Sequence, residues 1–193
     1  MARTKEFDPD AALGAALELF WERGYEATSM ADLVDRLGVA RASIYATFGG
    51  KRDLYLRALE RYDELTSPGI LQELSESGPA LPAVRAFVER YAAESMGEER
   101  RRGCFMANTA VELAPHDDEA ARRVRENWLT LETALTSALL RARAQGELAS
   151  DADPYALARF LVVLLQGMRV TGKASEEPSR LRAATEQALR LLD

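Results

Sequence analysis

The sequence predicts an all-α protein of about nine helices, and three observations carry this prediction. Apolar residues recur at the 3–4 spacing of a helix face along most of the 193 residues. No segment has the alternation of apolar and polar residues that is typical of a strand. Residues that favour helix N-termini, and glycines that favour helix C-termini, recur along the chain. We therefore expect short helices near the N-terminus, followed by longer ones that build a second helical region.

The first helices have clear local start and stop signals. Asp8 and Pro9 are an N-cap and a first-turn proline, and Gly24 ends the helix that they open. Ser29 and Asp32 form a capping box at the start of the second helix. The four N-terminal helices are expected at about 8–24, 29–38, 41–47 and 51–67, with the fourth fading at Ser67-Pro68-Gly69.

A loop at about 75–82, which contains two prolines and a glycine, precedes five further helices. They are expected at about 83–96, 104–113, 118–144, 154–170 and 178–192. The predicted organisation is an N-terminal domain at 1–50 and a second helical domain at 51–193. Residues 51–67 would form the connecting helix.

Composition limits the class of protein. The chain is 47% hydrophobic and 29% charged, and it has no apolar run of about 18 residues that could span a bilayer. The N-terminus lacks the apolar segment of a signal peptide. A single cysteine, Cys104, excludes an internal disulfide framework. These features predict a cytoplasmic protein with no membrane partner.

The charge distribution bears on nucleic-acid binding. The net charge of −6 does not by itself suggest DNA, so such a function requires a local basic surface. The stretch 36–52 provides four basic residues and no acidic one. Arg3 and Lys5 form a second basic cluster at the N-terminus. The four basic residues of the stretch are Arg36, Arg41, Lys51 and Arg52.

Two short helices joined at Gly38 predict a helix-turn-helix. Glycine permits the left-handed backbone that this turn needs, and Val39 would fill the gap between the helices. Leu33, Leu37 and Ile44 can form a small shared core. The outward residues of the second helix would then be Arg41, Ser43, Tyr45 and Thr47.

Residues 28–55 closely resemble the signature of the TetR family of regulators. The shared features are a helix ending at Gly38, the pair Ile44-Tyr45, then Phe48, Lys51 and Leu54. The first helix, which ends Phe20-Trp21-Glu22-Arg23-Gly24-Tyr25, is also similar, so the resemblance covers about residues 8–60. It implies a helix-turn-helix DNA-binding domain at 1–50 and a helical effector-binding and dimerisation domain at 51–193. The whole would be a dimeric repressor that binds a palindromic operator and is released by a small-molecule effector. Two positions depart from the pattern: Ala40 stands where Ser or Thr is frequent, and Ala46 where an aromatic is frequent.

The resemblance and the side-chain chemistry together suggest DNA contacts. Arg41 can donate two hydrogen bonds to guanine or to a phosphate. Lys51 opens a helix, where its charge and free backbone N–H groups suit a phosphate. Tyr45 could donate to a phosphate or have a purely structural role. The full predicted DNA-binding set is Ser29, Arg41, Ala42, Ser43, Tyr45, Thr47 and Lys51.

The second region offers an apolar lining with few polar groups, which is typical of small-molecule pockets. The predicted lining is Phe87, Tyr91, Cys104, Phe105, Asn108, Trp128 and Met168, with ordinary core packing as the alternative for each. The last two helices resemble the dimerisation pair of the family. Their apolar stripes are Leu157, Phe160, Leu161, Leu164 and Met168, and then Leu181, Ala184, Ala188 and Leu191.

Cys104 and His116 are single candidates for chemistry. Cys104 follows three arginines and opens a helix, and both features favour the thiolate. The Gly103-Cys104 step and Asn108 are similar to the branch of the family that includes the N-ethylmaleimide repressor, which senses electrophiles. A buried packing role is the alternative. His116 has no second His or Cys near it, so we expect no metal site and no cofactor.

Two other classes of function were weighed. A helical enzyme would need a catalytic constellation, which one histidine and one cysteine cannot provide, so we expect no enzyme. A helical adaptor that binds protein partners through amphipathic faces would lack specific operator binding. The sequence does not identify the effector, the operator or the regulated genes.

Overall fold

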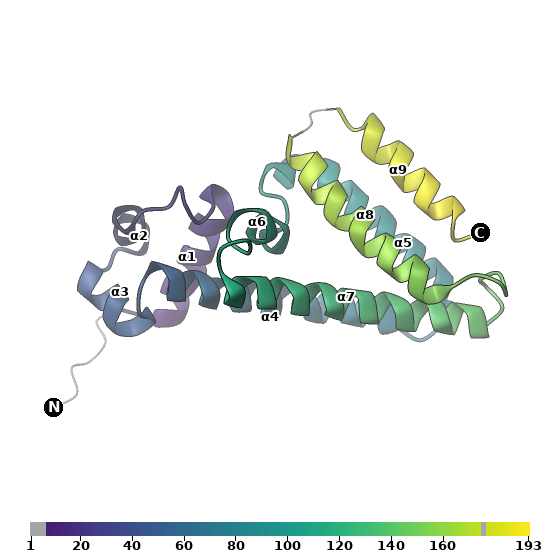
Figure 1. Ribbon diagram of the computed structural model, residues 1–193, viewed down its shortest axis with the longest axis horizontal. Coiled ribbons are helices and arrows are strands. Elements are labelled where there is room, and N and C mark those ends of the chain that lie inside the picture. The colour runs from purple at the N-terminus through teal and green to yellow at the C-terminus, as the bar shows by residue number, and fades with distance from the viewer. Residues whose placement is uncertain (1–6, 175–176) are drawn as a thin grey trace. The chain divides into compact units, whose positions relative to one another are not determined.

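The computed structural model describes residues 7–174 and 177–193, and this described part contains helices and no strand (Figure 1). The predicted all-α class is therefore confirmed. None of the helices in these residues has the length and apolar character needed to cross a membrane. The elements are α1 (Pro9–Arg23), α2 (Met30–Leu37), α3 (Arg41–Phe48), α4 (Lys51–Ser75), α5 (Ala80–Met96), the short 3₁₀ helix η1 (Glu98–Arg101), α6 (Phe105–Glu112), α7 (Asp118–Ala144), α8 (Pro154–Ala174) and α9 (Ser179–Arg190).

Two predicted helix boundaries near prolines are wrong. α4 was expected to fade at 67–69, but it continues through Pro68 to Ser75. Its last turns bury Leu74 and pack Ile70 against the core, which offsets the hydrogen bond that proline removes.

α5 begins at Ala80 rather than at residue 83. Pro82 lies in its first turn, where a missing N–H costs little. The free N–H groups of Ala80 and Leu81 donate to the side chains of Gln145 and Glu147, at 3.0 and 2.8 Å. These two distant acceptors act as the cap that the local sequence lacks.

The chain divides into two compact units. The first contains residues up to 65 together with 108–124, and the second contains 66–107 together with 125–193. This division does not coincide with the expected boundary at residue 50, because the start of α4, α6 and the start of α7 pack with α1, α2 and α3. The assignment of separate functions to 1–50 and 51–193 stays a prediction.

The first unit has a small aromatic and aliphatic core. Phe20, Leu33, Ile44 and Tyr55 are fully buried in it. The rings of Phe20 and Tyr55 meet edge to face with centroids 4.9 Å apart. Leu33 and Ile44 thus have the core role expected for the helix-turn-helix.

The second unit is built on α5, α8 and α9, which pack against one another, with the later parts of α4 and α7 (Figure 1). Gly172 of α8 lies against the backbone of Ser95 in α5, and a Cβ at this position would overlap the Ser95 carbonyl oxygen. The two helices therefore cross closely because residue 172 has no side chain.

Candidate functional site

The start and the end of α2 are fixed by local contacts, as the sequence predicts. The Ser29 hydroxyl accepts from the Asp32 N–H at 3.1 Å, and the Asp32 carboxylate accepts from the Ser29 N–H at 2.8 Å. Gly38 caps the helix with φ 65°, ψ 25°, a left-handed conformation that favours glycine. The turn between α2 and α3 is therefore set by residues within the turn itself.

α3 exposes a narrow face. Ile44 and Phe48 are buried, whereas Arg41, Ala42 and Tyr45 are exposed. The predicted residues Ser43 and Thr47 are only half-buried on the flank of this face. Ala46 is exposed but absent from the predicted set, although its position one turn after Ala42 could have indicated it.

Two basic residues of the 36–52 stretch lie over aromatic rings. The Arg41 guanidinium carbon is 5.7 Å from the centroid of the Tyr45 ring. Lys51, in the first turn of α4, places its Nζ 4.2 Å from the centroid of the Tyr25 ring. These cation–π contacts orient both charges while each remains available to an anion.

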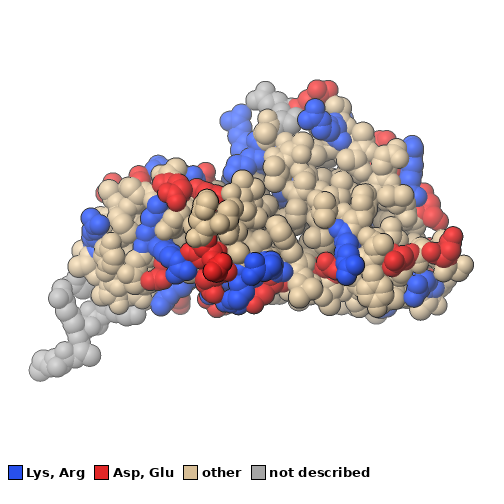
Figure 2. Space-filling view, in the orientation of Figure 1, with Lys and Arg blue, Asp and Glu red and all other residues tan. Residues whose placement is uncertain are grey.

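The other two basic residues of that stretch form ion pairs within the unit. Arg36 lies 3.7 Å from Glu22, and Arg52 lies 2.6 Å from Asp117. Figure 2 accordingly shows basic and acidic side chains interspersed on the visible face rather than one continuous basic patch. Arg3 and Lys5 lie outside the described residues.

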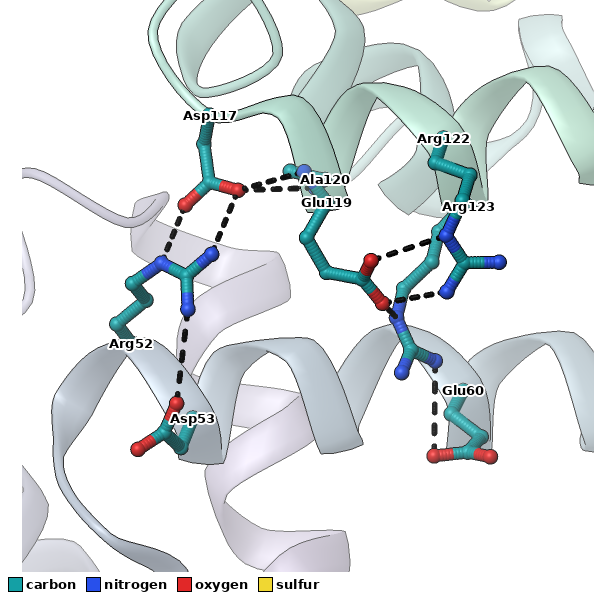
Figure 3. Close-up of polar contacts among 8 residues, drawn as sticks. All are labelled: Arg52, Asp53, Glu60, Asp117, Glu119, Ala120, Arg122 and Arg123. Atoms are coloured by element: carbon teal, nitrogen blue, oxygen red, sulfur yellow. Dashed lines mark hydrogen bonds and ion pairs between the residues drawn. The ribbon is translucent and has the colours of Figure 1, made fainter.

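An ion-pair network joins the start of α4 to the start of α7 (Figure 3). Arg52 donates from Nε and Nη2 to Asp117 at 2.6 and 3.0 Å. Asp117 also accepts from the N–H groups of Glu119 and Ala120, so it caps α7. These donors, Arg52 above all, hold the pKa of the Asp117 carboxyl below its usual value.

The same network extends one turn along both helices. Glu119 accepts from Arg122 at 2.5 Å and from Arg123 at 3.1 Å. Arg123 in turn lies 3.5 Å from Glu60 of α4. Within the first unit, two ion pairs one helical turn or more apart thus connect α4 with the start of α7, namely Arg52 with Asp117 and Glu60 with Arg123.

α6 is joined to the segment after α1 and to α4 by two further contacts. The Glu112 carboxylate accepts from the N–H groups of Tyr25 and Glu26, both at 2.9 Å. The Tyr55 hydroxyl is 2.8 Å from the Thr109 hydroxyl in a buried hydrogen bond. The sequence did not indicate Glu112, Tyr55 and Thr109, because no local pattern connects residues this far apart. We name these two contacts and the Arg52–Asp117 pair together the head clamp.

The structure brings only some of the predicted effector-binding residues together. Phe87, Tyr91 and Met168 are buried in one core cluster of the second unit, and Trp128 packs against it. Cys104 and Phe105 are also buried in the second unit. Asn108, however, belongs to the first unit, so the seven residues do not form a set within one unit.

A polar cluster that the sequence analysis missed surrounds Tyr91. The Arg169 guanidinium carbon lies 4.1 Å from the centroid of the Tyr91 ring, and Arg169 forms an ion pair with Glu94. Arg90 pairs with Glu94 at 2.5 Å and with Glu73 at 2.6 Å. Burial raises the pKa of the Tyr91 hydroxyl to about 12, so this hydroxyl is protonated at neutral pH.

A groove also opens between α4 and α7 within the second unit. Its volume is about 490 Å³, within the range of small-molecule sites. The hydroxyls of Thr130 and Thr133 donate to their own helix, at 3.0 and 2.7 Å, so the groove is largely apolar. None of the predicted effector residues belongs to the lining, which is Leu71, Leu74, Ser75, Leu129, Thr130, Thr133, Ala134 and Ser137.

The last two helices leave apolar residues exposed. Phe160, Val163 and Val170 follow one face of α8 and are 40%, 73% and 50% exposed; Leu191 after α9 is 56% exposed. Part of the predicted dimer stripe is wrong, because those side chains fill the core of the same chain. These core residues are Leu161, Met168, Leu181 and Ala188.

His116 is exposed, and its neighbour Asp117 serves the head clamp. In the described part of the chain, no group of three or more His, Cys, Asp or Glu residues could hold a metal ion.

Two family models match the chain. The model described as "Bacterial regulatory proteins, tetR family" matches residues 12–58, and that described as "Tetracyclin repressor-like, C-terminal domain" matches residues 80–188. The chain is 38% identical over 194 residues to the uncharacterized HTH-type transcriptional regulator YezE of Bacillus subtilis, with full coverage of both chains.

Two solved structures extend the comparison. A cysteine mutant of the TetR family transcriptional regulator CifR, complexed with 26-bp operator DNA, is 30% identical with a TM-score of 0.84, and the match covers 97% of this chain and 98% of the other. The reduced form of NemR of Escherichia coli is 18% identical with a TM-score of 0.85 over 95% and 96% of the two chains, which demonstrates a shared fold.

Proposed function

The chain belongs to the TetR family of bacterial regulatory proteins, and we propose that it is a dimeric repressor that binds a palindromic operator and is released by a small molecule. The exposed face of α3, with Arg41 stacked on Tyr45, carries this proposal. The operator complex of CifR, which is similar over almost the whole chain, supports it. A regulator of this kind acts on chromosomal DNA, and we infer a cytoplasmic, non-catalytic protein.

In the proposed complex, the two α3 helices of a dimer enter successive major grooves roughly 34 Å apart. Arg41 donates to a guanine edge or a phosphate from the exposed end of α3, and Tyr45 donates its hydroxyl to a phosphate. Ala42 lies on the same face and allows close approach of the helix to the bases. Ser43 and Thr47 flank this face, Ser29 approaches a phosphate from the start of α2, and Lys51 does so from the start of α4.

The first test of this proposal compares Arg41→Ala and Lys51→Ala on an operator recovered by selection from promoter fragments. Loss of an Arg41 base contact should cost about 1–3 kcal/mol and relax sequence preference, whereas loss of Lys51 should lower the salt slope by about one unit. Arg61→Ala is the control, because Arg61 pairs with Glu64 on the surface of α4. Gel shifts at several salt concentrations measure both effects, and wild-type behaviour of both variants would refute the assignment.

We propose that the dimer forms through the exposed apolar face of α8 and the end of α9. An apolar stripe of this kind is typical of an interface in a four-helix bundle. Val163→Glu should therefore give a helical monomer that binds operator weakly. Leu129→Glu, at a 62% exposed position of α7, is the matched control and should remain dimeric. Sedimentation velocity measures the oligomeric state, and a dimeric Val163→Glu variant would place the interface elsewhere.

A second candidate function is electrophile sensing by Cys104. Cys104 is 6% exposed, and it is close enough to Tyr91 to contribute, after burial, to the raised pKa of the Tyr91 hydroxyl. Covalent addition to this thiol would force bulk into a packed core and bias the chain away from its DNA-binding conformation.

Treatment of the operator complex with N-ethylmaleimide tests this candidate by comparing the wild type with Cys104→Ser. Release of the wild type alone supports sensing. If both proteins are released, or neither is, Cys104 has only a packing role in the core.

A further inference from the structure

The arginine and lysine side chains of the first unit fall into two groups. In the described part of this unit, most of them form ion pairs with carboxylates, namely Arg23, Arg36, Arg52, Arg61, Arg122 and Arg123. The others have no carboxylate partner in these residues, and each lies over an aromatic ring instead. They are Arg41 over Tyr45, Lys51 over Tyr25 and Arg57 over Phe48. The second group is therefore held in place without being neutralised.

Arg57 is the member of this second group that the sequence did not indicate. It is exposed on α4, and its nearest carboxylates along the helix are Asp53, four residues before it, and Glu60, three residues after it. Both of these acids pair with other arginines, at 3.6 and 3.5 Å. The guanidinium carbon of Arg57 lies 5.6 Å from the ring centroid of Phe48, the last residue of α3. Arg57 is thus directed to α3 rather than to an acid of its own helix.

An arginine that lies over a ring keeps its hydrogen-bond donors available. The ring contacts the flat face of the guanidinium, whereas the N–H groups point outward from its edge in a fork that matches a phosphate. The ring also limits the conformations of a long side chain, so less entropy is lost when an anion binds. Arg57 can therefore bind a phosphate while Phe48 holds it.

The position of Arg57 relative to α3 places it near DNA in the proposed complex. Arg41 begins α3, and Arg57 lies at its other end through the contact with Phe48. These two ends are about 11 Å apart along the helix axis, and the major groove that α3 would enter is about 12 Å wide. Because phosphate backbones border the groove on both sides, a cation at each end of α3 lies within reach of phosphates.

We propose that Arg57 binds a backbone phosphate of the operator and extends the DNA-binding surface from α3 and the first turn of α4 to the second turn of α4. The inference rests on the proposed repressor function, since it requires α3 to enter the DNA. Arg57 contributes affinity and not base preference, because a phosphate is the same in every sequence. The paired arginines of the unit stabilise the protein and do not contact DNA in this way.

The first test is the salt dependence of operator binding, measured by gel shift. Arg57→Met removes the charge and keeps an unbranched side chain over Phe48. Binding should weaken about tenfold at low salt, and the slope of log K against log salt should fall by about one unit for each phosphate contact that is lost. Arg57→Lys should retain the slope. Arg61→Met is the matched control one turn later and should behave as wild type, because Arg61 pairs with Glu64.

The second test locates the contact on the DNA. Ethylation interference neutralises single phosphates, and the wild type should be sensitive at one phosphate per half-site at which Arg57→Met is insensitive. This phosphate should differ from the one that Lys51→Ala ceases to detect. Arg57→Met should also weaken binding to a duplex of unrelated sequence by a similar factor, since the contact carries no base preference.

Each alternative outcome has a definite meaning. A wild-type salt slope in Arg57→Met, or an equal loss in Arg61→Met, would overturn the inference and leave the repressor function standing. Weaker binding with an unchanged slope and ethylation pattern would assign Arg57 only a packing role on Phe48, which a lower melting temperature by circular dichroism would accompany. If the wild type binds no operator, the repressor function fails and the inference fails with it.

Discussion

The two compact units of the chain are held together in different ways. In the first unit, the side-chain hydrogen bonds of the head clamp join α6 and the start of α7 to α4 and to the segment after α1. In the second unit, long helices pack apolar faces at close range, as at Gly172 and Ser95. The comparison teaches that helices of eight residues, such as α2 and α3, bury little surface by themselves and are stabilised by the core of the unit to which they contribute Leu33, Ile44 and Phe48.

The head clamp includes two residues of α6, the helix that follows Cys104 directly in the chain. Glu112 accepts from the N–H groups of Tyr25 and Glu26, and the Thr109 hydroxyl meets that of Tyr55. Trp21 lies in the first unit and Trp128 in the second, so the two tryptophans report on the two units separately.

The largest effect is expected from Gly172→Val. A side chain at this position would overlap the Ser95 carbonyl oxygen and force α5 and α8 apart, at a cost of about 3 kcal/mol. Urea unfolding followed by Trp128 fluorescence in a Trp21→Phe background measures this loss. Gly69→Ala is the control, since open space surrounds Gly69 in α4, and it should be neutral or slightly stabilising. A Gly172→Val protein as stable as wild type would disprove the close crossing.

A smaller effect is expected from Glu112→Ala. This change removes the acceptor for the N–H groups of Tyr25 and Glu26 and should destabilise the first unit by about 2 kcal/mol. Trp21 fluorescence in a Trp128→Phe background should report the loss. Glu112→Gln keeps one acceptor oxygen and should retain about half of the stability difference. Glu112→Ala should leave the stability reported by Trp128, in the Trp21→Phe background, unchanged. If Trp128 reports the same loss, the two units unfold together, and the proposed difference between them is contradicted.

The smallest effect is a dependence on pH. The pKa of Asp117 is lowered in the folded chain, so its contribution is complete above the ordinary value of about 3.9 and is lost as pH falls through the folded value. Asp117→Asn should therefore cost about 1 kcal/mol at neutral pH and progressively less below about pH 4. The free energy of unfolding of both proteins, measured between neutral and acid pH with Trp21 as reporter, checks this. A constant difference across the range would contradict the role of the Arg52 pair.

Local residues were sufficient to predict much of the helix-turn-helix. The capping box of Ser29 and Asp32 and the left-handed Gly38 are confirmed, as is the burial of Leu33 and Ile44. The DNA-contacting roles remain predictions. Exposure on α3 was predicted less well, because Ser43 and Thr47 stand beside the buried Ile44 and Phe48 on the helix and are half-buried.

The sequence by itself determined the helical class, most helix boundaries and the family, because caps, glycine conformations and the 3.6-residue period act within a few positions. Only the tertiary structure decided which contacts join distant segments. Glu112 meets Tyr25 across 87 positions, and Arg169 meets Glu94 across 75. It also decided that Leu161 faces the core while Val163, two residues later, faces outward. An apolar residue on a helix can stabilise its own core or a partner's, and only the packing of neighbouring helices distinguishes the two.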